Sequence, residues 1–281
     1  MRKKFNHILL KENDMINTII ERKSVRTYDG KNLKPEDLKV LKEYAENIET
    51  PFGIPAEFRF LEADKYGLKS PVLSGVNLYV AGKTEIVPYA DGSFGYAFEK
   101  LVLKAQSMGI GTVWIAGTMN RDAFEKAMEL KDNEFMPAVS PLGYPTKRSM
   151  REILMRKGIK ADSRIAYDKL FFEGSFKSPI SGSKYSELKE VLETVRWAPS
   201  AVNKQPWRVV VCDEMIHFYE HHDKGYKHAN GMDLQKVDLG IAICHFDLAL
   251  SEKGFNHEIV IDDPGLETPQ DVEYIASFKM K

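Results

Sequence analysis

The chain has 281 residues, of which 43% are hydrophobic and 29% are charged, and its formal net charge at pH 7 is -1. These totals are typical of a globular protein with a full core, and the balanced charge argues against a nucleic-acid or membrane partner. Two cysteines without CxxC spacing make no disulfide framework. The apolar run at residues 8–10 is too short for a signal sequence, and no stretch approaches the about 18 apolar residues of a membrane span. We therefore expect a cytoplasmic location.

The first predicted helix begins at Met15, where isoleucines recur at helical spacing behind Asp14 as the N-cap. Residues 1–13 show no clear pattern. The helix leads into ERKSVRTY, residues 21–28, in which three cations surround Ser24. Taken alone, this cluster slightly favours a solvated basic face. The competing interpretation is an anion site, because arginine offers forked donors to phosphate and lysine a point charge.

The remaining pattern alternates helices and short strands up to residue 148. It predicts helices from residue 35 and at 96–108 and 121–130, and strands at 57–61, 77–81, 112–117 and 135–145. Residues 149–181 form a connector rich in Arg and Lys, too long to be a simple loop. Beyond it the pattern predicts helices at 185–197 and 232–253, strands at 207–212, 215–222 and 257–263, and an edge strand or tail at 274–278.

APSAVNKQPW, residues 198–207, is an unusual connection between a helix and a strand. Pro199 and Pro206 restrict the backbone on either side, so the segment should be stiff. Ser200, Asn203 and Gln205 add uncharged donors and acceptors, which suit a neutral, flat ligand with polar edges. The alternative is a rigid turn that only feeds the strand.

The two halves of the chain repeat the same order of elements. EDLKVLKEYAENIETP, from Glu36, resembles SELKEVLETVRWAPS, from Ser186, and a strand follows each. Gly95 and Gly109 bracket a helix in the first half, and Gly240 and Gly254 bracket one in the second at an offset of 145. We therefore predict a first repeat at residues 15–148, a connector at 149–181 and a second repeat at 182–281.

The polar motifs are not repeated. The region before the second half lacks the RKSVR cluster, and the TPFGIPAE counterpart of PSAVNKQP lacks the Asn and Gln. Each half thus keeps a different part of one site, as expected if an ancestral two-chain site was fused into a single chain. A former dimer interface would then lie within the chain, giving a monomer that is an intrachain pseudo-dimer, or a weak homodimer.

Together, ERKSVRTY, APSAVNKQPW, GYAFEKLVLKAQSMGIGTVWIAG and LGYPTKR resemble the FMN-dependent nitroreductase superfamily over most of residues 15–260. Typical members are homodimers that carry both polar motifs near the N-terminus of one subunit. Here the two motifs lie about 175 residues apart (Arg22 to Ala198), which resembles nitroreductases with two fused family-like halves. The resemblance implies an α+β fold: a nitroreductase-like α/β/α sandwich, with two pseudo-symmetric half-repeats around a mixed, mainly antiparallel sheet.

The resemblance also implies which residues hold FMN. The basic cluster would hold the phosphate and one edge of the flavin, with further charge from the LGYPTKR segment. Residues 198–207 would line the flavin ring and the ribityl chain, and the C-terminal end of the predicted strand at 112–117 would contact the ring. The cofactor-binding residues expected on this basis are Arg22, Lys23, Ser24, Arg26, Ile115, Ala116, Gly117, Lys147, Arg148, Pro199, Ser200, Asn203 and Gln205.

The implied function is an FMN-binding, NAD(P)H-dependent oxidoreductase that reduces small electron-poor acceptors, nitroaromatic or quinone, by ping-pong hydride transfer through flavin N5. The cofactor carries this chemistry, so we assign no catalytic side chain. We also expect no metal: four histidines lie at residues 217–228, but His221 and His222 are adjacent and would point to opposite faces of a strand. The alternative function is a flavin-binding or flavin-free protein without efficient turnover, in storage or sensing.

Overall fold

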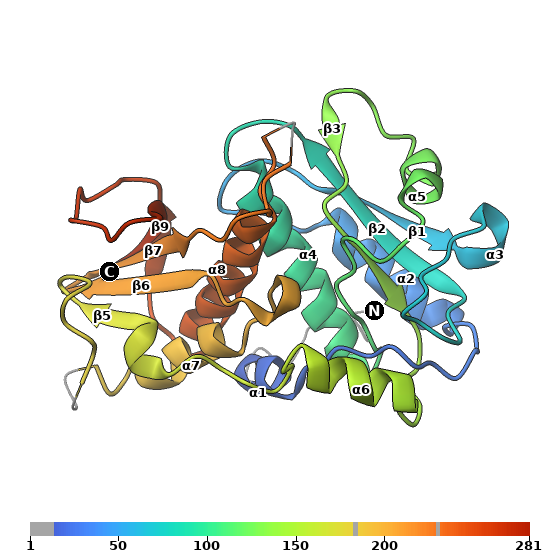
Figure 1. Ribbon diagram of the computed structural model, residues 1–281, viewed down its shortest axis with the longest axis horizontal. Coiled ribbons are helices and arrows are strands. Elements are labelled where there is room, and N and C mark those ends of the chain that lie inside the picture. Colours follow the sequence, from blue (N-terminus) through green and yellow to red (C-terminus); the bar gives the residue numbers. More distant parts are fainter. Residues whose placement is uncertain (1–13, 182–184, 229–230) are drawn as a thin grey trace, which may run out of the picture.

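Two sheets, one in each half of the chain, flank a central pair of crossed helices (Figure 1). In this computed structural model the described residues are 14–181, 185–228 and 231–281, so the leader at residues 1–13 lies outside them. The expected α+β fold with mainly antiparallel pairing is confirmed, and the strands are divided between two sheets. None of the described helices is long and apolar enough to cross a membrane.

In the first half, β2 is the strand to which the other three pair, all of them antiparallel. Its side chains are buried along nearly its whole length, as expected for a central strand. The elements are α1 (Met15–Glu21), α2 (Pro35–Glu46), β1 (Glu57–Glu62), α3 (Ala63–Tyr66), β2 (Leu78–Glu85), α4 (Ala90–Ser107), α5 (Arg121–Ala127), β3 (Glu134–Phe135) and β4 (Val139–Leu142).

The connector and the second half form a five-stranded sheet with the order β5-β6-β7-β9-β8, in which only the β5–β6 pair is parallel. The elements are α6 (Met150–Gly158), the 3-10 helix η1 (Tyr167–Lys169), β5 (Phe171–Glu173), α7 (Lys189–Trp197), the 3-10 helix η2 (Ala201–Asn203), β6 (Trp207–Cys212), β7 (Met215–His221), α8 (Leu234–Glu252), β8 (His257–Val260) and β9 (Val272–Met280). The predicted connector therefore contains a helix and supplies a strand to this sheet.

Two strand predictions were wrong. The chain ends inside the sheet rather than at its edge, because β9 pairs with β7 on one side and β8 on the other. Residues 112–117 form isolated bridges instead of a strand. Their backbone groups are shared between two neighbours, since Val25 N–H donates to the Thr112 carbonyl and Ile115 exchanges two hydrogen bonds of 2.9 Å with Val139.

The central helices α4 and α8 touch backbone to backbone at a pair of glycines. A Cβ atom on Gly95 would lie 2.1 Å from the Val237 carbonyl oxygen, and one on Gly240 would lie 2.1 Å from the Gly92 oxygen. Gly92 and Val237 are separated by the same 145 residues as Gly95 and Gly240. Reciprocal contacts of this kind are what a two-fold axis through the crossing produces.

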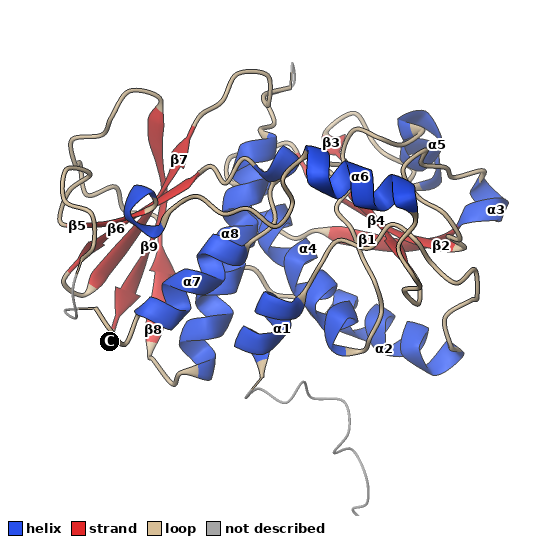
Figure 2. Cartoon of the chain, turned by 60° about the horizontal axis from the view of Figure 1, so that its bottom comes forward, coloured by secondary structure: helices blue, strands red, loops and turns tan. Residues whose placement is uncertain are grey.

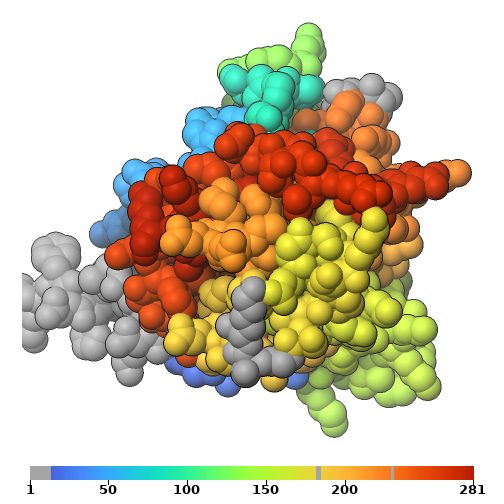
Figure 3. Space-filling model, turned by 90° about the vertical axis from the view of Figure 1, so that its left-hand side faces the viewer, coloured from blue at the N-terminus to red at the C-terminus, as the bar shows by residue number. Residues whose placement is uncertain are grey.

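The hydrophobic cores of the two halves also share side chains. Tyr96 and Leu103 of α4 belong to the second-half core, and Val237 of α8 belongs to a first-half core. Helix α1 packs on α7 and α8, as Figure 2 shows, and so fastens the start of the chain to the second half. In Figure 3 the C-terminal segment (red) crosses the outer face of the second half beside the end of the connector (yellow).

Candidate functional site

A cavity of about 410 Å³ lies where the two halves meet and is lined by residues of both. Its walls come from the basic segment after α1, the irregular segment at residues 113–118, the connector, the loop after α7 and the first turns of α8. We call it the cationic cavity. It brings together ten of the thirteen residues expected from the sequence: Arg22, Lys23, Ser24, Arg26, Ile115, Ala116, Gly117, Pro199, Ser200 and Asn203.

The other three expected residues do not line this cavity. Lys147 is exposed, and Arg148 pairs with Glu152 at 3.3 Å in a neighbouring hollow. Gln205 is buried behind the loop, where its Oε1 accepts a hydrogen bond from Ile165 N–H at 2.9 Å and its Nε2 donates to the Asn203 carbonyl at 3.2 Å. These side-chain atoms hold the loop against the connector.

Arg22 is the most deeply buried cation of the cavity. It is 7% exposed, and its Nε and Nη1 atoms have no hydrogen-bond acceptor within the described residues. Its nearest opposite charge is Glu99, with Oε1 3.7 Å from Nε. Burial lowers the pKa of Arg22, Glu99 partly offsets this, and the charge of Arg156 lowers the pKa further. A guanidinium left in this state would be stabilised by a further anion.

The connector adds two arginines that the sequence analysis did not assign to the site. Arg156 of α6 pairs with Asp162, and Arg164 lies with its Cζ 4.6 Å from the centre of the Trp197 ring. Burial, followed by the charge of Arg22, lowers the pKa of Arg164 to about 10. Burial is also the main cause that lowers the pKa of Arg26. The cations of the cavity thus repel one another in surroundings that solvate them poorly.

Glu99 is the second group that the sequence analysis did not single out. It is fully buried on α4, where Oε2 accepts a hydrogen bond from Trp114 Nε1 at 2.8 Å and Oε1 lies 2.9 Å from His245 Nε2. One carboxylate therefore joins both central helices to a wall of the cavity and faces Arg22. Its signal in the sequence was a lone acidic residue within the otherwise apolar run of a long helix.

The loop after α7 is held in a strained backbone conformation. Val202, Asn203 and Gln205 have φ values of 51°, 57° and 53°, in the left-handed region that residues other than glycine rarely adopt. Two anchors fix it. Both carboxylate oxygens of Asp238 accept from Ala201 N–H, at 3.1 and 3.0 Å, and Asn203 Nδ2 donates to the Lys160 and Ser163 carbonyls at 2.8 and 3.0 Å. Strain of this kind is typical of binding loops.

The family model "Putative TM nitroreductase" matches residues 14–250, which is most of the chain. The protein belongs to this nitroreductase family. Its membership supports an oxidoreductase activity. Among curated proteins, none matches the sequence.

The fold of the chain is similar along its whole length to a solved "putative nitroreductase" from Thermotoga maritima MSB8, with 18% sequence identity and a TM-score of 0.61, covering 99% of this chain and 98% of that one. Other solved relatives match about half of it. An NADH dehydrogenase/NAD(P)H nitroreductase from Bacteroides thetaiotaomicron VPI-5482 is 24% identical with a TM-score of 0.42, covering 49% of this chain and 89% of that one. An FMN-dependent nitroreductase from Clostridium difficile R20291 is 14% identical with a TM-score of 0.41, covering 48% and 89%.

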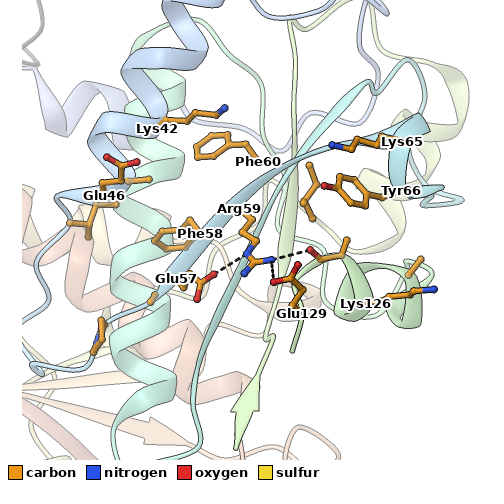
Figure 4. A pocket seen from close by; sticks show the side chains of 17 residues that line it. Lys42, Glu46, Glu57, Phe58, Arg59, Phe60, Lys65, Tyr66, Lys126 and Glu129 are labelled. Atoms are coloured by element: carbon orange, nitrogen blue, oxygen red, sulfur yellow. Dashed lines mark hydrogen bonds and ion pairs between the residues drawn. The ribbon is translucent and has the colours of Figure 1, made fainter. Parts of the chain in front are cut away.

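The chain also has a larger hollow, of about 970 Å³, against the outer strand β1 (Figure 4). Its arginine already has partners: Arg59 Nε lies 2.9 Å from Glu57 Oε1, and Arg59 Nη1 lies 3.0 Å from Glu129 Oε2. None of the residues expected from the sequence lines it. The cationic cavity, with its unsatisfied buried guanidinium, is therefore the better candidate for a ligand site.

Proposed function

We propose that this nitroreductase binds FMN in the cationic cavity and uses NADH or NADPH to reduce electron-poor acceptors of nitroaromatic or quinone type in a ping-pong cycle. When bound, FMN supplies the redox chemistry by accepting a hydride from the donor and passing the electrons to the acceptor. The proposal deepens the family's oxidoreductase activity by naming the cofactor and the acceptor class.

One observation carries the proposal. Arg22, Arg26, Arg156 and Arg164 converge with Lys23 on one cavity, and three of these arginines, Arg22, Arg26 and Arg164, have buried guanidinium nitrogens with no acceptor within the described residues. A phosphate group would supply both the negative charge and the acceptor oxygens that these groups lack. The fit of the residues to the phosphate end of FMN is therefore good.

The rest of the cavity suits a flat, largely neutral ring. Trp114, Ile115, Val237 and Ile241 give it apolar walls, and Ser200 lies on the polar loop. Ligand sites of this size combine apolar walls with a few polar groups that fix orientation. The chain's own residues would thus bind the phosphate, orient the ring against the wall, and exclude water from its buried face.

We also propose that the protein is a monomer, or at most a weak homodimer, because the crossing of α4 and α8 joins the two halves within one chain. Light scattering on the purified protein should give the mass of one chain at micromolar concentration. A stable dimer at all accessible concentrations would contradict this part of the proposal.

The test of function has two stages. Addition of the protein should quench FMN fluorescence, and anaerobic NADH or NADPH should then bleach the visible absorption of the complex. A colourless protein that does not quench added FMN would overturn the proposal. A bound flavin that neither donor bleaches would favour the alternative, a flavin-binding protein without efficient turnover in storage or sensing.

A further inference from the structure

A second group of ligand-type side chains lies where β7 ends and α8 begins. Glu220 is in β7, His222 follows that strand, and Asp233 precedes the first turn of α8. One nitrogen or oxygen atom from each of the three lies within 4.8 Å of the others. The histidines alone predict no metal here, because Asp233 reaches His222 only through the fold.

The two carboxylates of this group are buried and incompletely bonded. Glu220 is 0% exposed and Asp233 is 2% exposed. Both oxygens of Glu220 and Oδ2 of Asp233 make no hydrogen bond within the described residues, where the one ion-pair contact of Glu220 is with the His222 ring, whereas Asp233 Oδ1 accepts from Gln235 N–H at 2.9 Å. Burying charged oxygens without a partner is costly, so a cation between them would remove a large penalty.

The orientation of His222 is fixed from its far side. Its Nε2 lies 2.9 Å from Glu273 Oε2, a hydrogen bond that places the proton on Nε2. Nδ1, the other ring nitrogen, faces the two carboxylates, 2.6 Å from Glu220 Oε1 and 3.8 Å from Asp233 Oδ2, where it can give its lone pair to an ion bound between them. A carboxylate that orients a histidine in this way is the usual outer support of a metal ligand.

The nearby lysines do not replace such a cation. Lys236 donates to Glu273 Oε1 at 2.8 Å and so balances the supporting carboxylate. Lys227 is the cation nearest Asp233, but its Nζ lies 3.8 Å from Oδ2 and its side chain is 60% exposed. Glu220 receives no contact from either lysine among the ion pairs of the described residues.

We propose that Glu220, His222 and Asp233 bind a divalent transition-metal ion such as Zn²⁺ or Mn²⁺, with Glu273 as the residue that positions His222. One imidazole and two carboxylates form a nitrogen and oxygen ligand set that suits these ions. Ligand atoms bonded to one such ion lie about 3.3 Å apart in tetrahedral geometry. The separations of 2.6 and 3.8 Å bracket that value, so small side-chain movements complete the site.

The ion has a definite place in the fold. It ties the end of β7 to the first turn of α8, the helix that also borders the cationic cavity. Three protein ligands leave at least one coordination position for water. The site is separate from the proposed flavin site, so flavin binding and metal binding can be tested independently.

The experiment uses the full chain, freed of any affinity tag and of metal by a chelator. Calorimetric titration with ZnCl₂ alone and with MnCl₂ alone should show one ion per chain for at least one of the two, and the same ion should raise the unfolding temperature. MgCl₂ should bind more weakly, because Mg²⁺ prefers all-oxygen ligands. No uptake of either Zn²⁺ or Mn²⁺ would overturn the proposal.

Matched variants separate a metal site from a buried ion pair. His222→Ala and Glu220→Gln should each weaken binding by at least tenfold, and Glu273→Gln by roughly tenfold, the usual effect of losing an outer support. His221→Ala removes the neighbouring histidine, which has no ion-pair partner among those of the group, and should leave binding unchanged. Circular dichroism of each metal-free variant checks folding. Equal affinity in His222→Ala and the unmodified chain would overturn the proposal, as would a folded Glu220→Gln that binds normally.

Discussion

Two hollows border the first turns of α8, and they differ in charge. The cationic cavity takes Leu234 and Val237 from this helix and gathers five cations around them. The other hollow, of about 520 Å³, is bordered by three carboxylates and two lysines, and one of the carboxylates, Asp233, belongs to the proposed metal group. Its lining contains both members of four residue pairs that are 145 apart, among them Pro88 and Asp233, and Asp91 and Lys236. This hollow therefore spans the pseudo-two-fold axis of the helix crossing, whereas the cationic cavity lies to one side of it.

This comparison shows what a fused repeat makes available. Two identical chains must carry the same residues at both copies of a site, whereas one chain with two halves can change each copy separately. RKSVR and PSAVN from different halves remain together at one hollow. At the other, positions paired by the offset of 145 carry different side chains, such as Pro88 and Asp233 or Asp91 and Lys236.

The largest expected effect comes from the crossing that both hollows share. Gly95→Ala and Gly240→Ala each place a Cβ atom 2.1 Å from a backbone oxygen of the partner helix, so the helices must separate. We expect each to lower the free energy of unfolding by more than about 3 kcal/mol, measured by urea denaturation.

The matched control for this pair is Gly158→Ala in α6, where a Cβ atom would meet no atom within 4 Å. It should change the free energy of unfolding by less than about 1 kcal/mol. Because the contacts at Gly95 and Gly240 are reciprocal, their two effects should be similar. If either variant kept the free energy of unfolding of the unmodified chain, the pseudo-symmetric close contact of the two helices would be contradicted.

The next effect distinguishes the cationic cavity from its surroundings. Arg26→Ala should weaken FMN binding by about tenfold or more, which corresponds to the loss of one charge-assisted hydrogen bond. Fluorescence quenching gives the affinity directly. Arg148→Ala is the control, because this arginine lies near the site but pairs with Glu152 outside the cavity. It should change the FMN affinity by less than about twofold. Equal losses of affinity in the two variants would contradict the assignment of Arg26, and not Arg148, to the ligand site.

The smallest expected effect on the free energy of unfolding comes from the hydrogen bond between His257 and Asp247 of α8. His257 Nε2 lies 2.7 Å from Asp247 Oδ1 on α8, and Tyr96 of α4 donates to the other oxygen of the same carboxylate. The hydrogen bond to Asp247 raises the pKa of His257 above its ordinary value of 6.5. The bond therefore stabilises the fold fully below the unfolded pKa, and this contribution is lost as pH rises through the higher folded pKa.

His257→Gln should accordingly lower the free energy of unfolding more at pH 5.5 than at pH 9, by less than about 1 kcal/mol because the pair is half-buried and screened by solvent. Urea denaturation of both proteins at the two pH values measures the difference. A larger loss at pH 9 would contradict the assigned direction of the pKa shift.

Much of the fold could be predicted from the sequence, because the spacing of apolar residues along a helix or strand follows from which of its side chains are buried. The run WRVVVC predicted β6 with its observed ends. The glycine spacing located the C-terminal ends of the two central helices but not their starts, because Gly95 and Gly240 lie inside α4 and α8 rather than before them. The strand at residues 112–117 was mispredicted because its apolar residues are buried by bridges to two different segments rather than by one ladder. The inner position of β9 depends on the path of the chain after β8, which no local pattern encodes.

The candidate site could likewise be predicted where its residues are neighbours in the sequence, and not where only the fold brings them together. Motifs of neighbouring residues, such as Arg22 to Arg26, could be found in the sequence and do line the cavity. Arg156 and Arg164 could not, because a connector rich in Arg and Lys gives no sign of which cations turn inward. Gln205 carried the expected amide, but its left-handed backbone turns it toward Ile165. Tertiary packing, rather than residue type, decided these cases.

The central claim is that the cationic cavity holds a phosphorylated flavin. The most direct test compares the affinities of FMN and riboflavin by fluorescence quenching, since the two differ only in the phosphate. The buried guanidinium groups predict that FMN binds at least about tenfold more tightly, and that Arg22→Gln removes most of this preference. Equal affinity for the two flavins, or no quenching by either, would contradict the claim.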